Sequence, residues 1–311
     1  MTRRGKITAG LLGAAALAAS PSLAKQTEPP PAAAAPAPTV SGVVVNGQKA
    51  DPLVDRTSEF VRQHLPQSVI TEQYPRFHVD VCVKVVGLPE GFDAFVAKRV
   101  VEVAKEVGAP VAKAADCTPN VNVVFTTEPA MLMSDIAKRK DILLGFYYSQ
   151  AQFKKLRSFT RPVEARYVTR NIDQFGNSRL EIHDPLAWTD PPHGRAGSRL
   201  TASMSTEIMH SLIVADAGKA AGEKIDTVAD YIAVLALARW SGIERCNGLP
   251  TILNRLADDC PDAPDAATPQ DLALLKGLYS VDPRENGSQQ RATIASAIRK
   301  ATAAETRELS K

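Results

Sequence analysis

The sequence predicts an α+β fold that combines a mixed β-sheet with a helical C-terminal half. Three observations lead to this prediction. A strand, an amphipathic helix and a second strand follow one another within about 50 residues after Phe77, and further strand-like runs continue to Val214. The pattern is then helical as far as Ala303. One helix of that half, Val228 to Arg239, is apolar on most sides, so we expect it to be buried at the centre of the fold.

The first strand is predicted from Phe77 to Val85, because apolar and polar residues alternate there with period two. The helix begins after Pro89, with apolar positions at three- and four-residue steps, and Gly108 stands where a left-handed helix stop is expected. The run from Val121 to Phe125 is predicted as the second strand. A strand–helix–strand unit of this length places its two strands side by side and parallel.

The middle of the chain is predicted to add strands to this unit. A short helix is expected from Met131 to Lys138, and then a strand from Val163 to Thr169 with a polar turn at 171–177. A loop rich in Pro, Gly and Asp covers 184–197. The strand from Leu200 to Val214 ends in an apolar run, which indicates burial. Strands beyond a βαβ unit predict a mixed sheet.

The central helix has candidate capping residues at its start. Asp226 and Thr227 are possible N-caps, and Asp230 is three residues after Thr227, where a capping-box acid is expected. Tyr231 is expected to be a core aromatic residue.

Two further helices are predicted near the C-terminus. The first opens on Thr268-Pro269-Gln270-Asp271, which provides a cap, a proline at the first helical position and an acid at the third, and it continues to Tyr279. The second is amphipathic and spans Gln289 to Ala303. Residues 307–311 are expected to form a disordered tail.

The N-terminus has the pattern of a cleavable export signal. Three basic residues within the first six precede an apolar run, Ile7 to Ala19, that is too short to span a membrane. Small residues at the end of this region place the cleavage between Ala24 and Lys25. The pair Arg3-Arg4 leaves a twin-arginine signal open as an alternative to export of an unfolded chain. The sequence therefore predicts a signal peptide over 1–24 and a periplasmic or secreted location.

Composition divides the rest of the chain. Residues 25–50 are rich in Pro and Ala and are predicted to form a linker. Residues 51–306 are expected to form a single domain, with two sub-lobes divided near 216–226 as an alternative. Loss of the signal leaves 34 basic and 34 acidic residues, and no basic stripe is present, which argues against nucleic acid as a partner. No later segment is apolar over 18 residues, so no membrane span is expected after cleavage.

The sequence contains four cysteines, which in an oxidising compartment predict disulfides. Three pairings are possible. We favour the local one, Cys82 with Cys117 and Cys246 with Cys260, because the first pair is adjacent in the predicted βαβ unit and the second brackets a short segment. Neither spacing is the C-x-x-C of a redox-active or zinc-binding site.

Three stretches of the second half resemble zincin metalloproteases of the metzincin type. Thr227 to Leu237 looks like their active-site helix, Leu249 to Asn254 is similar to their methionine turn, and Asp271 to Tyr279 resembles their closing helix. The order of the predicted elements is also that of a zincin. This pattern is similar to that of a family of exported bacterial proteins, and the resemblance implies a zincin-like scaffold.

The zinc motif itself is missing from this resemblance. Such proteases need two histidines one helical turn apart and an adjacent glutamate as the general base. Here Asp230 and Tyr231 fall near the positions of the first ligand and the base, and Leu253 falls at the methionine position. The resemblance therefore implies the scaffold without the protease activity, and no metal or other cofactor is expected.

A second stretch, Thr206 to His210, contains the glutamate and second histidine of a zinc motif. In a regular strand the odd offset between Glu207 and His210 places their side chains on opposite faces. This interpretation argues against a zinc site there. Glu207 and His210 are nevertheless kept, with Asp230 and Tyr231, as candidates for the lining of a pocket.

The remaining histidines suggest no clear site. His64, His78, His183 and His193 are scattered, although a loop His–Asp pair could serve as a base and its orienting acid. We therefore expect an exported, non-catalytic envelope protein that binds an unknown envelope component. A secreted or periplasmic hydrolase derived from a metallopeptidase and acting through non-standard residues is the alternative, and a purely structural envelope protein is a third.

Overall fold

The computed structural model describes residues 52–114, 116–181 and 202–309. All of them belong to one compact unit, which begins at Lys49. The predicted signal peptide, the cleavage between Ala24 and Lys25, the linker over 25–50, and His183 and His193 lie outside the described residues. The fold is α+β with a mixed five-stranded sheet, as the sequence predicts.

The strand order of the sheet is β1-β2-β5-β3-β4. Strands β1 (Val83–Val86), β2 (Val121–Thr126) and β5 (Met204–Asp216) are parallel, whereas β3 (Val163–Asp173) and β4 (Ser178–Leu180) continue the sheet in antiparallel pairs. The predicted βαβ unit is confirmed, because helix α2 (Phe92–Val107) connects the parallel neighbours β1 and β2.

Strand β1 is shorter than the strand predicted from Phe77. Before Val83 the chain turns to a different partner: the Val81 N–H donates to Pro110 O and the Ala112 N–H donates to Val81 O. This pairing takes the earlier residues out of register with β2. At the other end of the unit, Gly108 ends α2 in the left-handed conformation (φ 82°), as predicted.

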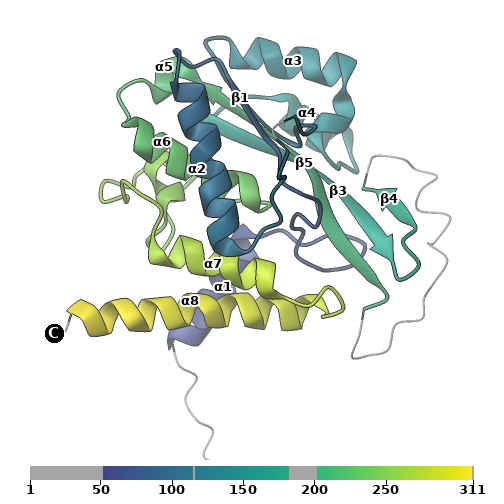
Figure 1. Ribbon diagram of the computed structural model, residues 1–311, viewed down its shortest axis with the longest axis vertical. Helices are drawn as coiled ribbons and strands as arrows, with labels where there is room; N and C mark the ends of the chain where they lie inside the picture. The colour runs from purple at the N-terminus through teal and green to yellow at the C-terminus, as the bar shows by residue number, and fades with distance from the viewer. Residues whose placement is uncertain (1–51, 115, 182–201, 310–311) are drawn as a thin grey trace, which may run out of the picture. The chain divides into compact units, whose positions relative to one another are not determined.

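One face of the sheet carries the larger hydrophobic core (Figure 1). Helices α2 and α6 (Ile225–Leu237) contact the sheet, and α7 (Pro269–Ser280), α8 (Gly287–Leu309) and α1 (Pro52–His64) complete the same core. Every residue of α6 from Ala229 to its end is buried. The predicted central buried helix is therefore confirmed, together with the helical C-terminal half.

The opposite face is covered at one end by a smaller group of elements. Helix α3 (Pro129–Arg139), the 3₁₀ segment η1 (Asp141–Leu144) and helix α4 (Gln150–Arg157) surround a second core cluster that includes Met133 and Leu212. Helix α3 is longer than predicted, and α4 was not predicted.

Two predicted helix ends are corrected. Helix α6 begins at Ile225, and its N-cap position is Lys224, with no side-chain cap, so neither Asp226 nor Thr227 caps it. Helix α8 runs to Leu309 and includes 307–309 of the predicted tail, where the sequence after Ala303 contains good helix formers such as Ala, Glu, Arg and Leu. Residues 310–311 are outside the described part of the chain.

Both disulfides occur in the favoured pairing, Cys82–Cys117 and Cys246–Cys260. The first closes onto the start of β1 and the second onto a loop after α6. None of the described helices combines the length and the apolarity that crossing a bilayer requires.

Candidate functional site

The structure gives Asp230 a structural role. Its Oδ1 accepts a hydrogen bond from Arg99 Nε of α2 at 2.5 Å, and its Oδ2 accepts the N–H of Ala267 at 2.8 Å. The carboxylate therefore joins α6 to α2 and to the loop before α7. The predicted role as a capping-box acid is wrong, because both oxygens face these partners and α6 begins earlier.

Two other residues singled out by the zincin resemblance are buried in the larger core. Tyr231 is buried, and its burial raises the pKa of its hydroxyl to about 12. Leu253, in the 3₁₀ segment η2 (Ile252–Leu256), is also buried. In the described part of the chain these two side chains are packed against other core residues.

Strand β5 contains an irregularity at Met209. Its pairing with β3 passes from Val168 opposite His210 directly to Thr169 opposite Ile208. Met209 is therefore an extra residue without a partner on β3, which is a β-bulge. A bulge shifts the alternation of side chains by one position.

This shift overturns the prediction that Glu207 and His210 lie on opposite faces. Ile208 and Ile213 share the larger core although their offset is odd, while Leu212 belongs to the smaller core on the other face. Glu207 and His210 are thus both on the face of Leu212. Regular alternation predicted the opposite because spacing alone does not reveal a bulge.

The two side chains nevertheless have separate partners. Glu207 forms an ion pair with Arg170, and burial raises the pKa of Glu207 despite that partner. Asn122 Nδ2 lies 2.6 Å from His210 Nε2 and, being a donor, uses the lone pair that a metal ion would need. Burial lowers the pKa of His210. The described residues contain no group of three or more His, Cys, Asp or Glu side chains placed to hold a metal ion.

A cleft elsewhere on the molecule is open. It has a volume of about 370 Å³ and lies between helix α1 and the segment from Gly242 to Leu249. Its lining includes the side chains of Arg56, Phe60, His64, Arg245 and Leu249.

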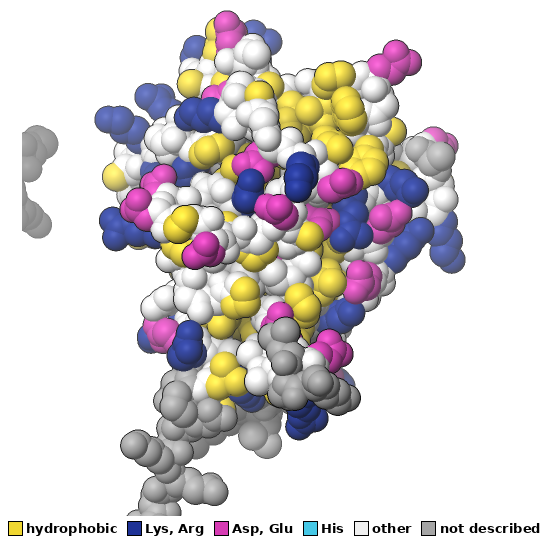
Figure 2. Space-filling model, turned by 90° about the vertical axis from the view of Figure 1, so that its left-hand side faces the viewer, with side chains coloured by type: hydrophobic (Ala, Val, Ile, Leu, Met, Phe, Trp, Pro, Cys, Tyr) yellow, Lys and Arg dark blue, Asp and Glu magenta, His cyan; other side chains and the backbone are white. Residues whose placement is uncertain are grey.

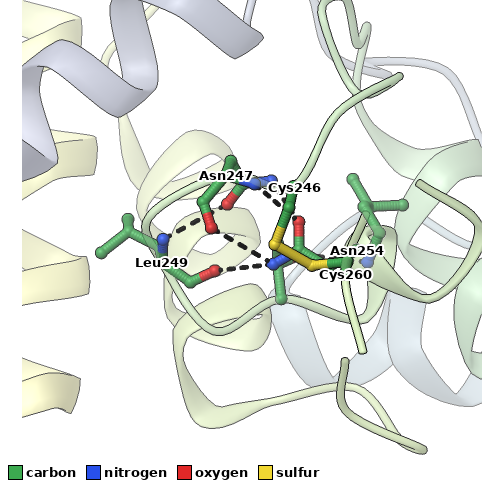
Figure 3. The surroundings of a disulfide bond; sticks show 7 residues. Cys246, Asn247, Leu249, Asn254 and Cys260 are labelled. Atoms are coloured by element: carbon green, nitrogen blue, oxygen red, sulfur yellow. Dashed lines mark hydrogen bonds between the residues drawn. A yellow bond between two sulfur atoms is a disulfide. The ribbon is translucent and has the colours of Figure 1, made fainter. Parts of the chain in front are cut away.

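The Cys246–Cys260 loop holds one wall of this cleft in place (Figure 3). The buried Asn254 side chain lies within the loop: its Oδ1 accepts from Asn247 Nδ2 at 2.6 Å, and its Nδ2 donates to Leu249 O at 3.1 Å. Leu249 N–H in turn donates to Asn247 Oδ1 at 3.3 Å. The disulfide and this amide network fix the backbone of the wall.

Helix α1 is fastened directly to this wall. Arg56 Nη2 donates to Gly248 O at 3.2 Å, and Ser241 N–H donates to His64 O at 3.0 Å. His64 Nδ1 lies 3.2 Å from Ser241 O, which can only accept, so Nδ1 is the protonated nitrogen. Within the described residues His64 Nε2 has no hydrogen-bond partner, and His64 is one of the residues that line the cleft.

The cleft has an excess of positive charge. Glu59, its only acidic lining residue, forms an ion pair with Arg62 and accepts from Gln63 Nε2 at 2.5 Å. Arg56 and Arg245 form no ion pair with any residue in the described ranges. Two guanidinium groups are therefore available to a ligand.

The sequence reading missed this site. Of its lining residues, His64 was considered only as one of several scattered histidines, Cys246 only as a disulfide partner and Leu249 only within the resemblance to a methionine turn, and α1 was not predicted at all. A signal for the helix exists, since Leu53, Phe60, Val61 and Leu65 recur at helical spacing after Pro52. No local signal joins α1 to a loop almost 200 residues later, because Arg56 and Gly248 are separated by 192 positions.

The face of the molecule drawn in Figure 2 agrees with the predicted charge balance. Figure 2 shows basic and acidic side chains interspersed over one face, without a basic stripe. Hydrophobic side chains gather at the upper end of that face, where α2 begins. Phe92 and Phe95 of α2 are both exposed.

Comparisons of the chain with protein-family models, with curated proteins and with solved structures found no match.

Proposed function

We propose that this protein is an exported, non-catalytic envelope protein on a zincin-like scaffold, and that it acts by binding a ligand in the cleft between α1 and the Cys246–Cys260 loop. The main support for the proposal is the difference between helix α6 and the cleft. The face of α6 that would bear a zinc site is filled by Asp230, Tyr231 and their neighbours, whereas the cleft is open and has two arginines that form no ion pair with the described residues.

The two disulfides support export, because disulfides persist in oxidising compartments. The N-terminal sequence supports it independently, through its basic start, its short apolar run and its small residues before Lys25. Placement in the periplasm or outside the cell is part of the proposal.

The alternative is a hydrolase that uses non-standard residues, for which His183, His193 and His210 would have to converge in one cleft; of the three, the structure describes His210. Its Nε2 accepts from Asn122 and its Nδ1 is buried without a partner, so neither nitrogen faces a nucleophile or a metal ligand among the described side chains. The bonding of His210 therefore favours a non-catalytic role.

The test uses the full chain expressed in a bacterial host and purified from its envelope fraction. We expect a mature N-terminus at Lys25, no stoichiometric zinc, and no hydrolysis of peptide or ester substrates. Zinc that copurifies at one equivalent and is lost together with activity in His210→Ala would contradict the proposal. The matched control is His78→Ala, which removes an exposed histidine outside β5.

Localisation is tested separately. Retention of the full-length chain in the cytoplasm, with the N-terminal signal uncleaved, would contradict the export part of the proposal and leave the binding part to be judged on its own.

A further inference from the structure

We infer that the cleft binds a small organic anion whose carboxylate or phosphate group is held by Arg56 and Arg245. The inference deepens the proposed function, because it names the chemical class of the ligand. It depends on the cleft alone, and neither export nor the absence of zinc enters into it.

The positive charge of the two arginines suits an anionic ligand. Guanidinium groups recognise carboxylate and phosphate through paired N–H donors. Arg56 uses Nη2 for Gly248 O, and the other donors of its guanidinium make no hydrogen bond within the described residues. Arg245 makes no ion pair in the same part of the chain, although the cleft wall around it is fixed by the disulfide.

The acidic residue of the cleft does not cancel this charge. Glu59 Oε2 accepts from Nε and Nη2 of Arg62, and its Oε1 accepts from Gln63 Nε2. Arg62 is one turn further along α1 and is not a lining residue. Both carboxylate oxygens of Glu59 are therefore engaged by neighbouring side chains of α1, and the two arginines leave the cleft with a net positive charge.

Part of the cleft lining is apolar. Phe60 and Leu249 line the cleft and are buried, and the Phe60 and His64 rings are in tilted contact with centroids 4.6 Å apart. A ligand that is only an ion, such as sulfate, would leave this surface uncovered. An anionic group with an apolar or aromatic body would cover both parts, and a volume of about 370 Å³ is suited to a ligand of that kind.

The Nε2 atom of His64 is a further polar group of the cleft lining. Because Nδ1 donates to Ser241 O, the orientation of the ring is fixed, and Nε2 has no hydrogen-bond partner within the described residues. Nε2 accepts a ligand N–H or O–H when the ring is neutral and donates to an anion when it is protonated. His64 thus adds one directed polar contact beside the two arginines.

The experiment compares four probes that share one body: 4-phenylbutyrate, 3-phenylpropyl phosphate, the neutral 4-phenylbutanamide and the cationic 4-phenylbutylamine. Binding to the purified mature chain is measured by calorimetry and by shifts of the backbone amide signals of Gly242, Asn247, Gly248 and Leu249. The variants are Arg56→Gln, Arg245→Gln and the double variant. Arg139→Gln on α3 is the control, since it removes an equal charge across the sheet.

We expect at least one of the two anions to bind and to shift the cleft amides, with the amide and amine probes at least about 10-fold weaker. Each single arginine variant should weaken the anion by about 10-fold, the double variant should abolish binding, and Arg139→Gln should leave it unchanged. Binding of only the carboxylate or only the phosphate supports the inference and identifies which group is recognised.

Two results would overturn it. Equal binding of the anionic and neutral probes would show an apolar site without anion selectivity and would leave the proposed binding function intact. No binding of either anion at millimolar concentration would remove the anion site, whereas the zinc and hydrolysis assays judge the non-catalytic role separately.

Discussion

Arg99 on α2 and Asp230 on α6 form an ion pair, with 2.5 Å between Nε and Oδ1, that joins the two helices in contact with the sheet. The same carboxylate accepts the Ala267 N–H, so it holds three segments together. A residue located near a metal-ligand position in the zincin resemblance thus has a packing role here.

Replacing Asp230 with alanine should lower the free energy of unfolding by about 2 kcal/mol, because it leaves the Ala267 N–H and the Arg99 guanidinium without their acceptor. The loss stays below that of a fully buried pair because Arg99 is 32% exposed and water screens its charge. Asp230→Asn, which keeps an oxygen acceptor, should lose less. Urea unfolding followed by circular dichroism measures both.

The control for this prediction is Asp135→Ala on α3, which breaks an exposed pair with Lys138 at 3.9 Å. We expect a loss of about 0.5 kcal/mol or less. An equal loss in Asp135→Ala and Asp230→Ala would show that Asp230 has no special structural role.

Asp271 should make stability depend on pH. Its buried carboxylate accepts hydrogen bonds from the hydroxyls of Thr251 and Thr268 and from the N–H groups of Ile252 and Thr268. Burial nevertheless raises its pKa above the ordinary value, so the folded state favours the protonated acid. Its contribution to stability is full below the unfolded pKa of about 3.9 and is lost as pH rises through the folded pKa.

Asp271→Asn should therefore flatten the change of stability above about pH 4, because an amide does not titrate. Asp271→Ala should cost about 2 kcal/mol near pH 4, since it leaves two buried N–H groups unpaired, and less as pH rises, because the wild type itself loses stability there. Urea midpoints over this pH range test both variants. Equal pH slopes for the wild type and Asp271→Asn would contradict the prediction.

Gly87 and Gly91 provide a matched pair for a steric prediction. Both have positive φ, 99° and 87°, but a Cβ on Gly87 would lie 2.0 Å from Phe125 O, whereas one on Gly91 meets nothing within 4 Å. We expect Gly91→Ala to cost about 1 kcal/mol for its backbone conformation and Gly87→Ala about 3 kcal/mol, because β1 and β2 must separate. Thermal unfolding of the two variants measures the difference, and similar melting temperatures would refute it.

The two disulfides should differ in what their loss affects. Chain entropy gives about 4 kcal/mol for Cys82–Cys117, which spans 35 residues, and about 3 kcal/mol for Cys246–Cys260, which spans 14. Only the second supports the cleft. Cys246→Ser/Cys260→Ser should therefore weaken binding of the anionic probe, while Cys82→Ser/Cys117→Ser should lower stability and leave the affinity of the folded protein unchanged. Equal affinities in the two double variants would disprove this distinction.

Much of the fold could be predicted because its signals are local. Period-two and helical spacing led to the βαβ unit, the capping box of α7 depends on residues within one turn, and the unbroken apolar character of α6 indicated its central position. The bulge at Met209 could not be predicted, because it depends on which residues of β3 are paired with β5. That one residue reversed the predicted relation of Glu207 and His210.

The cleft could not be predicted from local sequence patterns for a similar reason. Its two walls come from opposite ends of the domain, and the charge of Arg56 has meaning only once Glu59 is seen to be engaged by Arg62. The motifs that resemble zincins also pointed to α6, although this helix is buried from Ala229 to its end.

The first and last described helices, α1 and α8, contact one another, and Arg299 Nη1 donates to Thr57 Oγ1 at 3.5 Å. A chain that emerges N-terminus first therefore presents α1 long before Ser241, Gly248 and α8, the segments that α1 contacts. We therefore expect α1 to dock onto the rest of the domain late in folding.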